Sequence, residues 1–161
     1  MATALDMLNN LRAMQMNAIA EDVLNQTSST AVQMNRGQLY DGKLSTGDDI
    51  SPTYLEDPYF KSKESAQKYS DWKDAITPNP RRKKGVPNLF IIGAYHESIT
   101  AEAKGGGLLY KSSFYRASNI ESKFSVNVYG LGGEYREQFL QNELEPAWQQ
   151  RIEAETGLKF K

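Results

Sequence analysis

The single histidine is the first candidate for chemistry, because imidazole titrates near neutral pH. His96 is followed by Glu97 and Ser98, which are residue types of a Ser/His/acid set. Neighbours along a strand point to opposite faces, so adjacent positions are poorly placed to form such a set. One histidine and no cysteine also give too few ligands for a metal cluster. We therefore expect an ordinary, partly exposed histidine, and no metal or cofactor.

Paired carboxylates are the second candidate. They occur as Asp48–Asp49, Glu56–Asp57 and Glu143–Glu145. Acid/base catalysis needs two carboxyl groups whose surroundings separate their pKa values. No pair is flanked by the aromatic or apolar residues that would do so, and Asp48–Asp49 follows a glycine, as turn residues often do. We predict that the protein is not an enzyme.

Two glycine-rich strings could in principle cradle a phosphate. They are Gly105–Gly107 and Gly130–Gly133. Neither is followed by the Lys-Ser or Lys-Thr of a nucleotide-binding loop, and neither has the three-glycine spacing of a dinucleotide site. We interpret both strings as turns.

The sharpest charge feature is the run Arg81, Arg82, Lys83 and Lys84. Four adjacent cations could bind phosphate, bind an acidic surface of another subunit, or form a solvated loop. The whole chain has 19 basic and 20 acidic residues, whereas nucleic-acid-binding domains usually have a basic excess. Of the two functional interpretations we favour a protein partner, and a small nucleic-acid-binding module is the alternative.

The size of the chain fits one domain. Its 161 residues fall within the common range for a single domain, so we assign residues 1–161 to one unit. The sequence has no apolar run long enough to span a bilayer and no leader-like start, so we expect a soluble protein that does not contact membrane. Hydrophobic residues make up only 39%, but nine tyrosines are present. Since tyrosine is enriched at interfaces, this composition suggests a core shared with neighbours.

The N-terminal part has helical periodicity. We predict a helix over residues 3–26, capped by Thr3 and ended by the polar cluster Thr27–Thr30. A second, shorter helix is predicted over residues 31–40. The apolar stripe of the first helix consists of Leu8, Leu11, Met14 and Ala18, extended by Ile19 and Val23.

Residues 41–87 are predicted to form a long, irregular arm, because glycine and proline interrupt the segment repeatedly. Only a polar helix over residues 62–73 is expected inside it. The arm is rich in large aromatic side chains of the kind that dominate protein interfaces. We therefore predict a partner-binding surface made of Tyr54, Tyr59, Phe60, Tyr69, Trp72, Arg81, Arg82, Lys83 and Lys84.

The C-terminal half predicts a small antiparallel sheet and a closing helix. Three strands are expected, over residues 98–103, 108–114 and 122–129, the last because Phe124, Val126 and Val128 alternate with polar residues. A helix over residues 134–155 should be kinked near Pro146 and should stop at Thr156–Gly157. Together with the N-terminal helices and the arm, this order predicts an α+β fold.

Several short motifs occur in one order along the chain. They are Leu-Phe-Ile-Ile-Gly-Ala-Tyr-His-Glu-Ser-Ile over residues 89–99, Tyr129-Gly130-Leu131, Leu144-x-Pro146 and Thr156-Gly157-Leu158. This arrangement resembles the phage virion-morphogenesis and tail-completion proteins, which are head–tail connectors. The chain is also similar to ring proteins of the short-tailed crAss-like phages. Ile92 stands where that family usually has threonine, so tail-completion protein, head–tail adaptor and ring protein all stay open as the subfamily.

The resemblance implies a structural subunit at the portal-to-tail junction. Copies of the chain would form a ring of six or twelve, with twelve preferred, and the ring would line or surround the DNA passage. Its partners would be adjacent portal, adaptor or tail proteins, with transient contact to genomic DNA. The protein would then be located in the neck or tail of the virion, after assembly in the host cytoplasm. The resemblance implies no catalytic residues in this chain.

Overall fold

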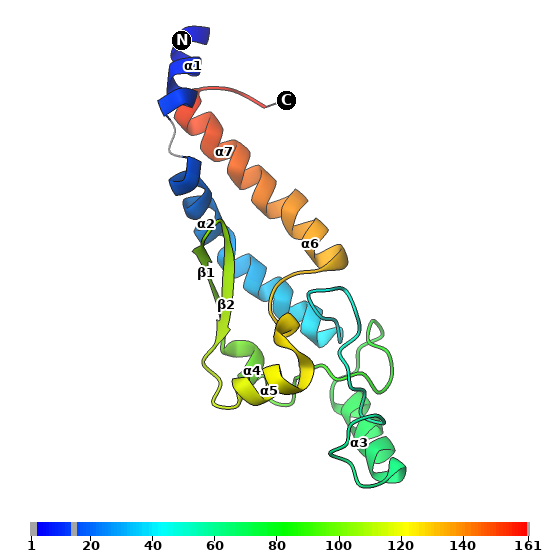
Figure 1. The fold of residues 1–161 in the computed structure, drawn as a ribbon. Coiled ribbons are helices and arrows are strands. Elements are labelled where there is room, and N and C mark those ends of the chain that lie inside the picture. Colours follow the sequence, from blue (N-terminus) through cyan, green and yellow to red (C-terminus); the bar gives the residue numbers. More distant parts are fainter. Residues whose placement is uncertain (1–2, 14–15, 161) are drawn as a thin grey trace.

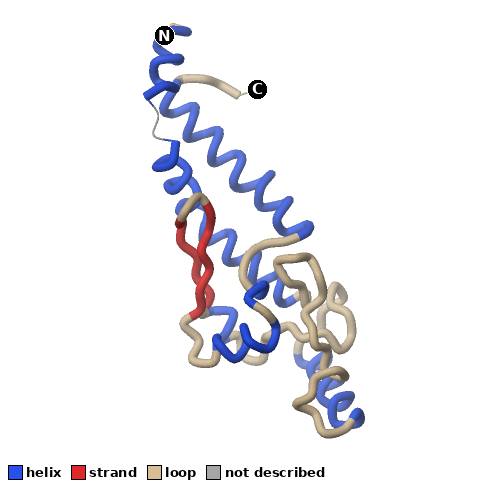
Figure 2. The backbone as a smooth tube through the Cα atoms, in the orientation of Figure 1, coloured by secondary structure: helices blue, strands red, loops and turns tan. Residues whose placement is uncertain are grey.

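The structure is a computed structural model that describes residues 3–13 and 16–160. Figures 1 and 2 show an elongated molecule in which long helices run beside a β-hairpin, with a loop-rich region at the end away from both termini. The fold class is α+β, as predicted. The elements in chain order are α1 (Ala4–Ala13), α2 (Met16–Tyr40), α3 (Lys63–Ile76), α4 (Ala94–Glu97), β1 (Ile99–Lys104), β2 (Gly107–Ser112), α5 (Ala117–Phe124), the 3-10 turn η1 (Val126–Val128), α6 (Gly133–Phe139), the π turn η2 (Leu140–Leu144) and α7 (Glu145–Thr156).

The N-terminal cap is confirmed, but the predicted helix boundaries are wrong. Thr3 accepts from the Asp6 amide at 3.1 Å, while Asp6 accepts from the Thr3 amide at 2.9 Å, which is a reciprocal capping box. Helix α2 runs on through the cluster Thr27–Thr30, where we expected an end. Met14, part of the predicted stripe, lies outside the described residues.

The hydroxyl groups of that cluster explain why α2 continues. Thr27 Oγ1 donates to the Val23 carbonyl at 2.9 Å, and Ser28 Oγ donates to the Asn25 carbonyl at 2.8 Å. Hydroxyls bonded back to the preceding turn leave the helical backbone bonds in place. Thr27 is also buried, so packing supports the helix where composition alone predicted a break.

The predicted hairpin is confirmed, and the third predicted strand is wrong. β1 and β2 pair antiparallel from Ile99 opposite Ser112 to Lys104 opposite Gly107. Residues 122–129 instead hold the end of α5 and the turn η1. The sheet therefore has two strands in the part of the chain that the structure describes.

Two buried amides of α2 explain why residues 128–132 need no partner strand. Asn35 Nδ2 donates to the carbonyls of Val128 and Gly130 at 3.0 and 2.8 Å. Gln38 Nε2 donates to the Gly130 carbonyl at 3.0 Å, and Gln38 Oε1 accepts from the Gly132 amide at 2.8 Å. We call these four bonds the amide clamp. Side chains here satisfy backbone groups that a strand ladder would otherwise satisfy.

The closing helix passes Pro146 without a break. Because proline has no amide hydrogen and its ring crowds the carbonyl four residues back, the preceding residues adopt a π turn. In it the Glu145 amide donates to the Leu140 carbonyl. The predicted kink thus takes the form of η2 between α6 and α7. The predicted stop is confirmed, since Gly157 caps α7 in the left-handed conformation at φ 73°.

The predicted arm, residues 41–87, is closed by backbone hydrogen bonds within itself, and it is bonded to the body through Ser45, whose amide donates to the Asn127 carbonyl at 2.8 Å. The Ile50 amide donates to the Gly42 carbonyl at 2.8 Å, and the Tyr54 amide donates to the Gly85 carbonyl at 2.9 Å. Inside the arm, Ser62 caps α3 by accepting from the Ser65 amide, as the predicted helix start requires. The hydrophobic core packs both ends of the arm against α2, α4, β1 and the segment after β2. Its buried members are Val32, Leu39, Leu44, Ile50, Val86, Tyr95, Ile99, Ala117 and Val128.

Candidate functional site

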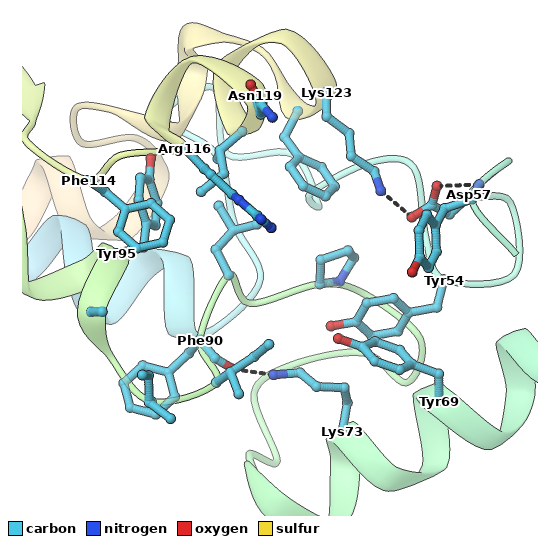
Figure 3. Close-up of a pocket in the computed structure, with 18 of the residues that line it drawn as sticks. Tyr54, Asp57, Tyr69, Lys73, Phe90, Tyr95, Phe114, Arg116, Asn119 and Lys123 are labelled. Atoms are coloured by element: carbon cyan, nitrogen blue, oxygen red, sulfur yellow. Dashed lines mark hydrogen bonds and ion pairs between the residues drawn. The ribbon is translucent and has the colours of Figure 1, made fainter.

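The main cavity is an apolar groove of about 900 Å³ at the loop-rich end of the molecule. Its walls come from α3, from the loop that follows Pro87, from α4 and from residues 114–124 (Figure 3). We call this cavity the groove. A volume of this size can hold a peptide segment or a drug-sized molecule. The side chains that shape it most are Tyr54, Tyr59, Phe60, Tyr69, Lys73, Leu89, Phe90, Ile91, Ile92, Tyr95, Phe114, Tyr115, Arg116, Ile120, Lys123 and Phe124.

The structure brings the predicted aromatic residues together in one row, and all of them except Trp72 line the groove. Tyr69 lies at their centre, with ring centroids 5.0 Å from Tyr54, 5.2 Å from Phe60 and 5.4 Å from Trp72. Tyr59 extends the row through Phe60 at 5.4 Å. Edge-on and tilted pairs at these separations are favourable. This aromatic row therefore forms a continuous wall.

Apolar side chains stand unusually far into solvent at the lip of the groove. Ile92 is 83% exposed and Ile91 is 58% exposed, while Tyr59 and Tyr115 are 79% and 78% exposed. All four also line the groove. Single exposed apolar residues are common, but a contiguous group around a cavity marks an interaction site. We call these four residues the lip.

The backbone of the loop that carries the two isoleucines is strained. Leu89 has φ 52°, a left-handed conformation that costs a branched residue energy. Gly93 ends the loop at φ 86°, and a Cβ there would lie 3.1 Å from the Phe90 ring. Strain of this kind is commonly retained at binding sites. Sequence analysis identified the apolar run but not its exposure.

A buried lysine lies in the groove wall beside the loop that carries Ile91 and Ile92. Lys73 is 1% exposed, and its Nζ donates to the Phe90 carbonyl oxygen (Figure 3). Burial lowers the pKa of Lys73 to about 8, and the Arg82 charge acts in the same direction. Sequence analysis missed this residue. Its position four residues after Tyr69, on the buried side of a helix, was the available signal.

Other polar groups of the groove come from residues 114–124. Lys123 pairs with Asp57, which neutralises both charges. Arg116 stacks over Tyr115 at 5.1 Å and has no ion-pair partner in the part of the chain that the structure describes. The groove therefore combines apolar walls with an excess of positive charge.

The basic run is largely neutralised within the chain. Arg81 pairs with Asp41 at 2.6 Å and also with Glu134. Lys83 pairs with Asp49 at 2.5 Å. Arg81 thus links the arm to α6 through Glu134, whereas Lys83 pairs within the arm. They are less available to an outside partner than the sequence suggested.

Two predicted contact residues lie in the interior. Arg82 is 7% exposed, pairs with Asp74 at 2.9 Å and donates to the Thr77 carbonyl at 3.0 Å. Tyr54 is also 7% exposed. The predicted surface therefore loses Arg82, which does not line the groove, whereas Tyr54 contributes only the part of its ring that lines the groove. Lys84 is exposed and has no ion pair among the described residues.

Arg82 and Lys84 should respond differently to substitution. Arg82→Ala is expected to lower the free energy of unfolding by about 2–4 kcal/mol, because it removes buried stem packing and leaves the Thr77 carbonyl without its donor. Lys84→Ala should change it by less than about 0.5 kcal/mol. Urea denaturation followed by circular dichroism measures both. Equal effects for the two variants would contradict the structural role of Arg82.

The histidine is buried instead of partly exposed, which corrects our expectation. His96 is 5% exposed, and its Nε2 lies 2.9 Å from the Asn88 carbonyl oxygen. Burial lowers its pKa to about 4, so the ring is neutral at pH 7. Ser98 bonds instead to Ser112 at 2.6 Å and to the Tyr95 carbonyl at 2.6 Å. The Ser/His pair of a nucleophilic site is therefore not formed.

Other sequence motifs have simple structural roles. Gly105 and Gly106 have φ of 59° and 80° and make the turn of the hairpin, as interpreted. Within residues 3–13 and 16–160, no three His, Asp or Glu side chains converge as metal ligands would. No helix of that part is long and apolar enough to cross a membrane. Comparison with protein-family models, with curated proteins and with solved structures finds no match for this chain.

Proposed function

We propose that this protein is a non-catalytic structural subunit that binds other protein chains through the groove and its lip. The observation that carries the proposal is the exposure of Ile91, Ile92, Tyr59 and Tyr115 around one cavity. Leaving so much apolar surface in water is unfavourable, and burying it against a partner reverses the cost. Aromatic anchors beside a preformed groove are the usual centre of a protein interface.

The resemblance to phage connector proteins narrows this proposal. The chain would assemble as a ring at the portal-to-tail junction of a virion, in six or twelve copies, and would contact neighbouring portal, adaptor or tail proteins. An elongated subunit with its docking surface near one end (Figure 1) is compatible with such a ring. The alternative, nucleic-acid binding through residues 81–84, has less support because Arg81, Arg82 and Lys83 are ion-paired within the chain.

Native mass spectrometry and negative-stain microscopy of the full chain test the proposal. We expect a closed homo-oligomer, seen as rings, either alone or after addition of neighbouring proteins from the same particle. A chain that stays monomeric at about 100 μM, alone and with those neighbours, would contradict it. Binding to duplex DNA that weakens steeply with salt, and that needs Lys83 and Lys84, would instead favour the alternative.

A further inference from the structure

We propose that the groove binds a segment of a neighbouring protein that is apolar and carries a carboxylate, and that Arg116 pairs with this carboxylate. The inference rests on the proposed function and names the chemistry of the partner. It follows from the charges that line the groove, taken together with the apolar lip. Each of these two features excludes part of the range of partners.

The charged side chains of the groove are few and unbalanced. The basic residues that line it are Lys73, Arg116 and Lys123. Asp57 alone is acidic among the described residues of the lining, and it pairs with Lys123. Two positive charges are left over. The chain as a whole has a formal net charge of −1, so this excess belongs to the groove and not to the protein in general.

Arg116 is the cation that a partner can reach. It is exposed, and Figure 3 shows its side chain extending into the groove from the side of α5. Its guanidinium lies over the Tyr115 ring at 5.1 Å and has no ion-pair partner among residues 3–13 and 16–160. A guanidinium presents several donors in one plane, which suits the two oxygens of a carboxylate.

Lys73 adds a second positive charge from α3 (Figure 3). Its ammonium is buried and donates to the Phe90 carbonyl oxygen, which is a neutral acceptor. The adjacent acid, Asp74, pairs with Arg82. The pKa of Lys73 is lowered to about 8, so most of the ammonium groups are still charged at pH 7. A carboxylate brought near this charge is stabilised by it.

The lip and the unpaired charges together determine what can cover the groove. Burying Ile91 and Ile92 against a partner is favourable, but the same contact removes Arg116 from water. Desolvating a cation is costly unless a carboxylate pairs with it. A basic segment would add repulsion, and an uncharged segment would leave the guanidinium unpaired. An apolar segment that contains Asp or Glu meets both requirements.

A nucleic acid fits these residues less well. Its phosphates are commonly neutralised by about six to ten contacts, whereas the lining of the groove has two cations without an ion pair in the described part of the chain. Nucleic acids bind single-stranded grooves largely by stacking bases on aromatic rings. Ile91 and Ile92, which are 58% and 83% exposed, offer no flat face for a base. The groove therefore favours a protein segment.

Selection of peptides tests the chemistry of the partner. A displayed library of random peptides of about twelve residues is selected on the full chain, and the double variant Ile91→Asp and Ile92→Asp removes peptides that bind elsewhere. Both isoleucines are exposed, so this variant should keep the circular dichroism spectrum of the native chain. We expect the retained peptides to be apolar and to contain acidic residues at least about three times as often as basic ones.

A double-mutant cycle then tests the role of Arg116. A selected peptide is compared with the same peptide in which its acidic residue is replaced by the matching amide, on the native chain and on Arg116→Gln. The protein substitution should weaken binding of the acidic peptide about tenfold and that of the amide peptide less than about twofold. Isothermal titration calorimetry measures the four affinities.

Lys84→Gln is the matched control, because it removes the same charge outside the groove. Lys84 is exposed, does not line the groove and has no ion pair among the described residues. This variant should bind each peptide within about twofold of the native chain. A loss equal to that of Arg116→Gln would mean that the attraction is not specific to the groove, which contradicts the inference.

Other outcomes would also overturn the inference. They are a selection that retains uncharged or basic peptides or none, and an Arg116→Gln chain that binds both peptides equally less well. A single-stranded oligonucleotide that binds more tightly than any selected peptide, and that needs Arg116, assigns the groove to nucleic acid. The proposed function survives these results if the native chain forms rings that Ile91→Asp and Ile92→Asp abolish. Acidic-peptide binding by a chain that is monomeric under every condition would instead support the groove chemistry and contradict the ring.

Discussion

Replacing Gly132 with alanine is expected to lower the free energy of unfolding by about 3–5 kcal/mol. A Cβ at this position would overlap the Ser45 carbonyl oxygen and would lie 2.5 Å from the Ser45 carbonyl carbon. The backbone of Ser45 cannot move aside as a flexible side chain can. It is held in place by a hydrogen bond from the Ser45 amide to the Asn127 carbonyl at 2.8 Å. The substitution should also displace the Gly132 amide from Gln38, which breaks one bond of the amide clamp.

The matched control is Gly107→Ala, since a Cβ on Gly107 would meet nothing within 4 Å. This variant should differ from the native chain by less than about 1 kcal/mol. Urea denaturation of the three proteins measures the differences. Because a domain is stable by only about 5–15 kcal/mol, Gly132→Ala should lose a large share of the stability of the native chain. A Gly132→Ala chain as stable as the control would mean that residues 45 and 132 do not approach as described.

Replacing Lys73 with methionine is expected to stabilise the protein at neutral pH and to remove a pH dependence. Methionine keeps most of the length of the stem and removes a charge that burial disfavours. Because the pKa of Lys73 is lowered from 10.5 to about 8, carrying the charge at pH 7 costs about 3 kcal/mol. Loss of the bond to the Phe90 carbonyl offsets part of the gain. We expect a net increase of about 1–2 kcal/mol.

The sign of the pH dependence follows from the lowered pKa. Below pH 8 the ammonium is charged in both states, and the folded state carries the full penalty. As the pH rises from about 8 toward 10.5, the folded state loses its proton before the unfolded state does, so the native chain becomes more stable. Between pH 7 and 9.5 the free energy of unfolding should rise by about 2 kcal/mol. Above pH 10, ionisation of tyrosines in the unfolded chain acts in the opposite direction, because burial raises the pKa of Tyr54 and Tyr95.

Denaturation at pH 7, 8.5 and 9.5 checks this prediction. Lys68→Met is the control, since Lys68 lies on the exposed side of the same helix and should leave the rise unchanged. If the free energy of unfolding of Lys73→Met still rises with pH as it does for the native chain, then a group other than Lys73 is responsible for the rise. A buried charge that costs stability is commonly retained for function. We therefore expect Lys73→Met to be a more stable chain that assembles less well.

The sequence alone predicted those elements whose ends are set by local chemistry. The start of α3 at Ser62, the hairpin turn at Gly105–Gly106 and the stop at Gly157 each depend on one cap or one left-handed glycine. Such residues begin or end an element by bonding to groups three or four positions away in the sequence. They are therefore visible without knowledge of the tertiary structure.

The errors occurred where distant contacts decide the local structure. Alternation of Phe124, Val126 and Val128 predicted a strand, yet Val128 is fully buried and Val126 is 66% exposed. Ser125 breaks the pattern at φ 79°, and Asn35 on α2 takes the place of a neighbouring strand. No local signal in residues 122–129 reveals that an amide about ninety positions away will satisfy their carbonyls.

The candidate site could be predicted only in part, because one of its walls also depends on contacts between distant parts of the chain. The aromatic residues of the arm were identified by type, and the structure places all of them except Trp72 in one wall. The other wall, from residues 89–95 and 114–124, is joined to it only by tertiary packing. Arg82 was misassigned because a run of four cations gives no sign of which one points inward.

The amide clamp also determines when the protein can finish folding as it is synthesised. Gln38 and Gly132 are 94 residues apart, which corresponds to about 5–20 s of translation. During that interval the two amides of α2 lack the carbonyls that they later bind. A chain released before Gly132 would expose these polar groups and the unfinished core together. Quality-control proteases could thus distinguish an incomplete chain from a finished one.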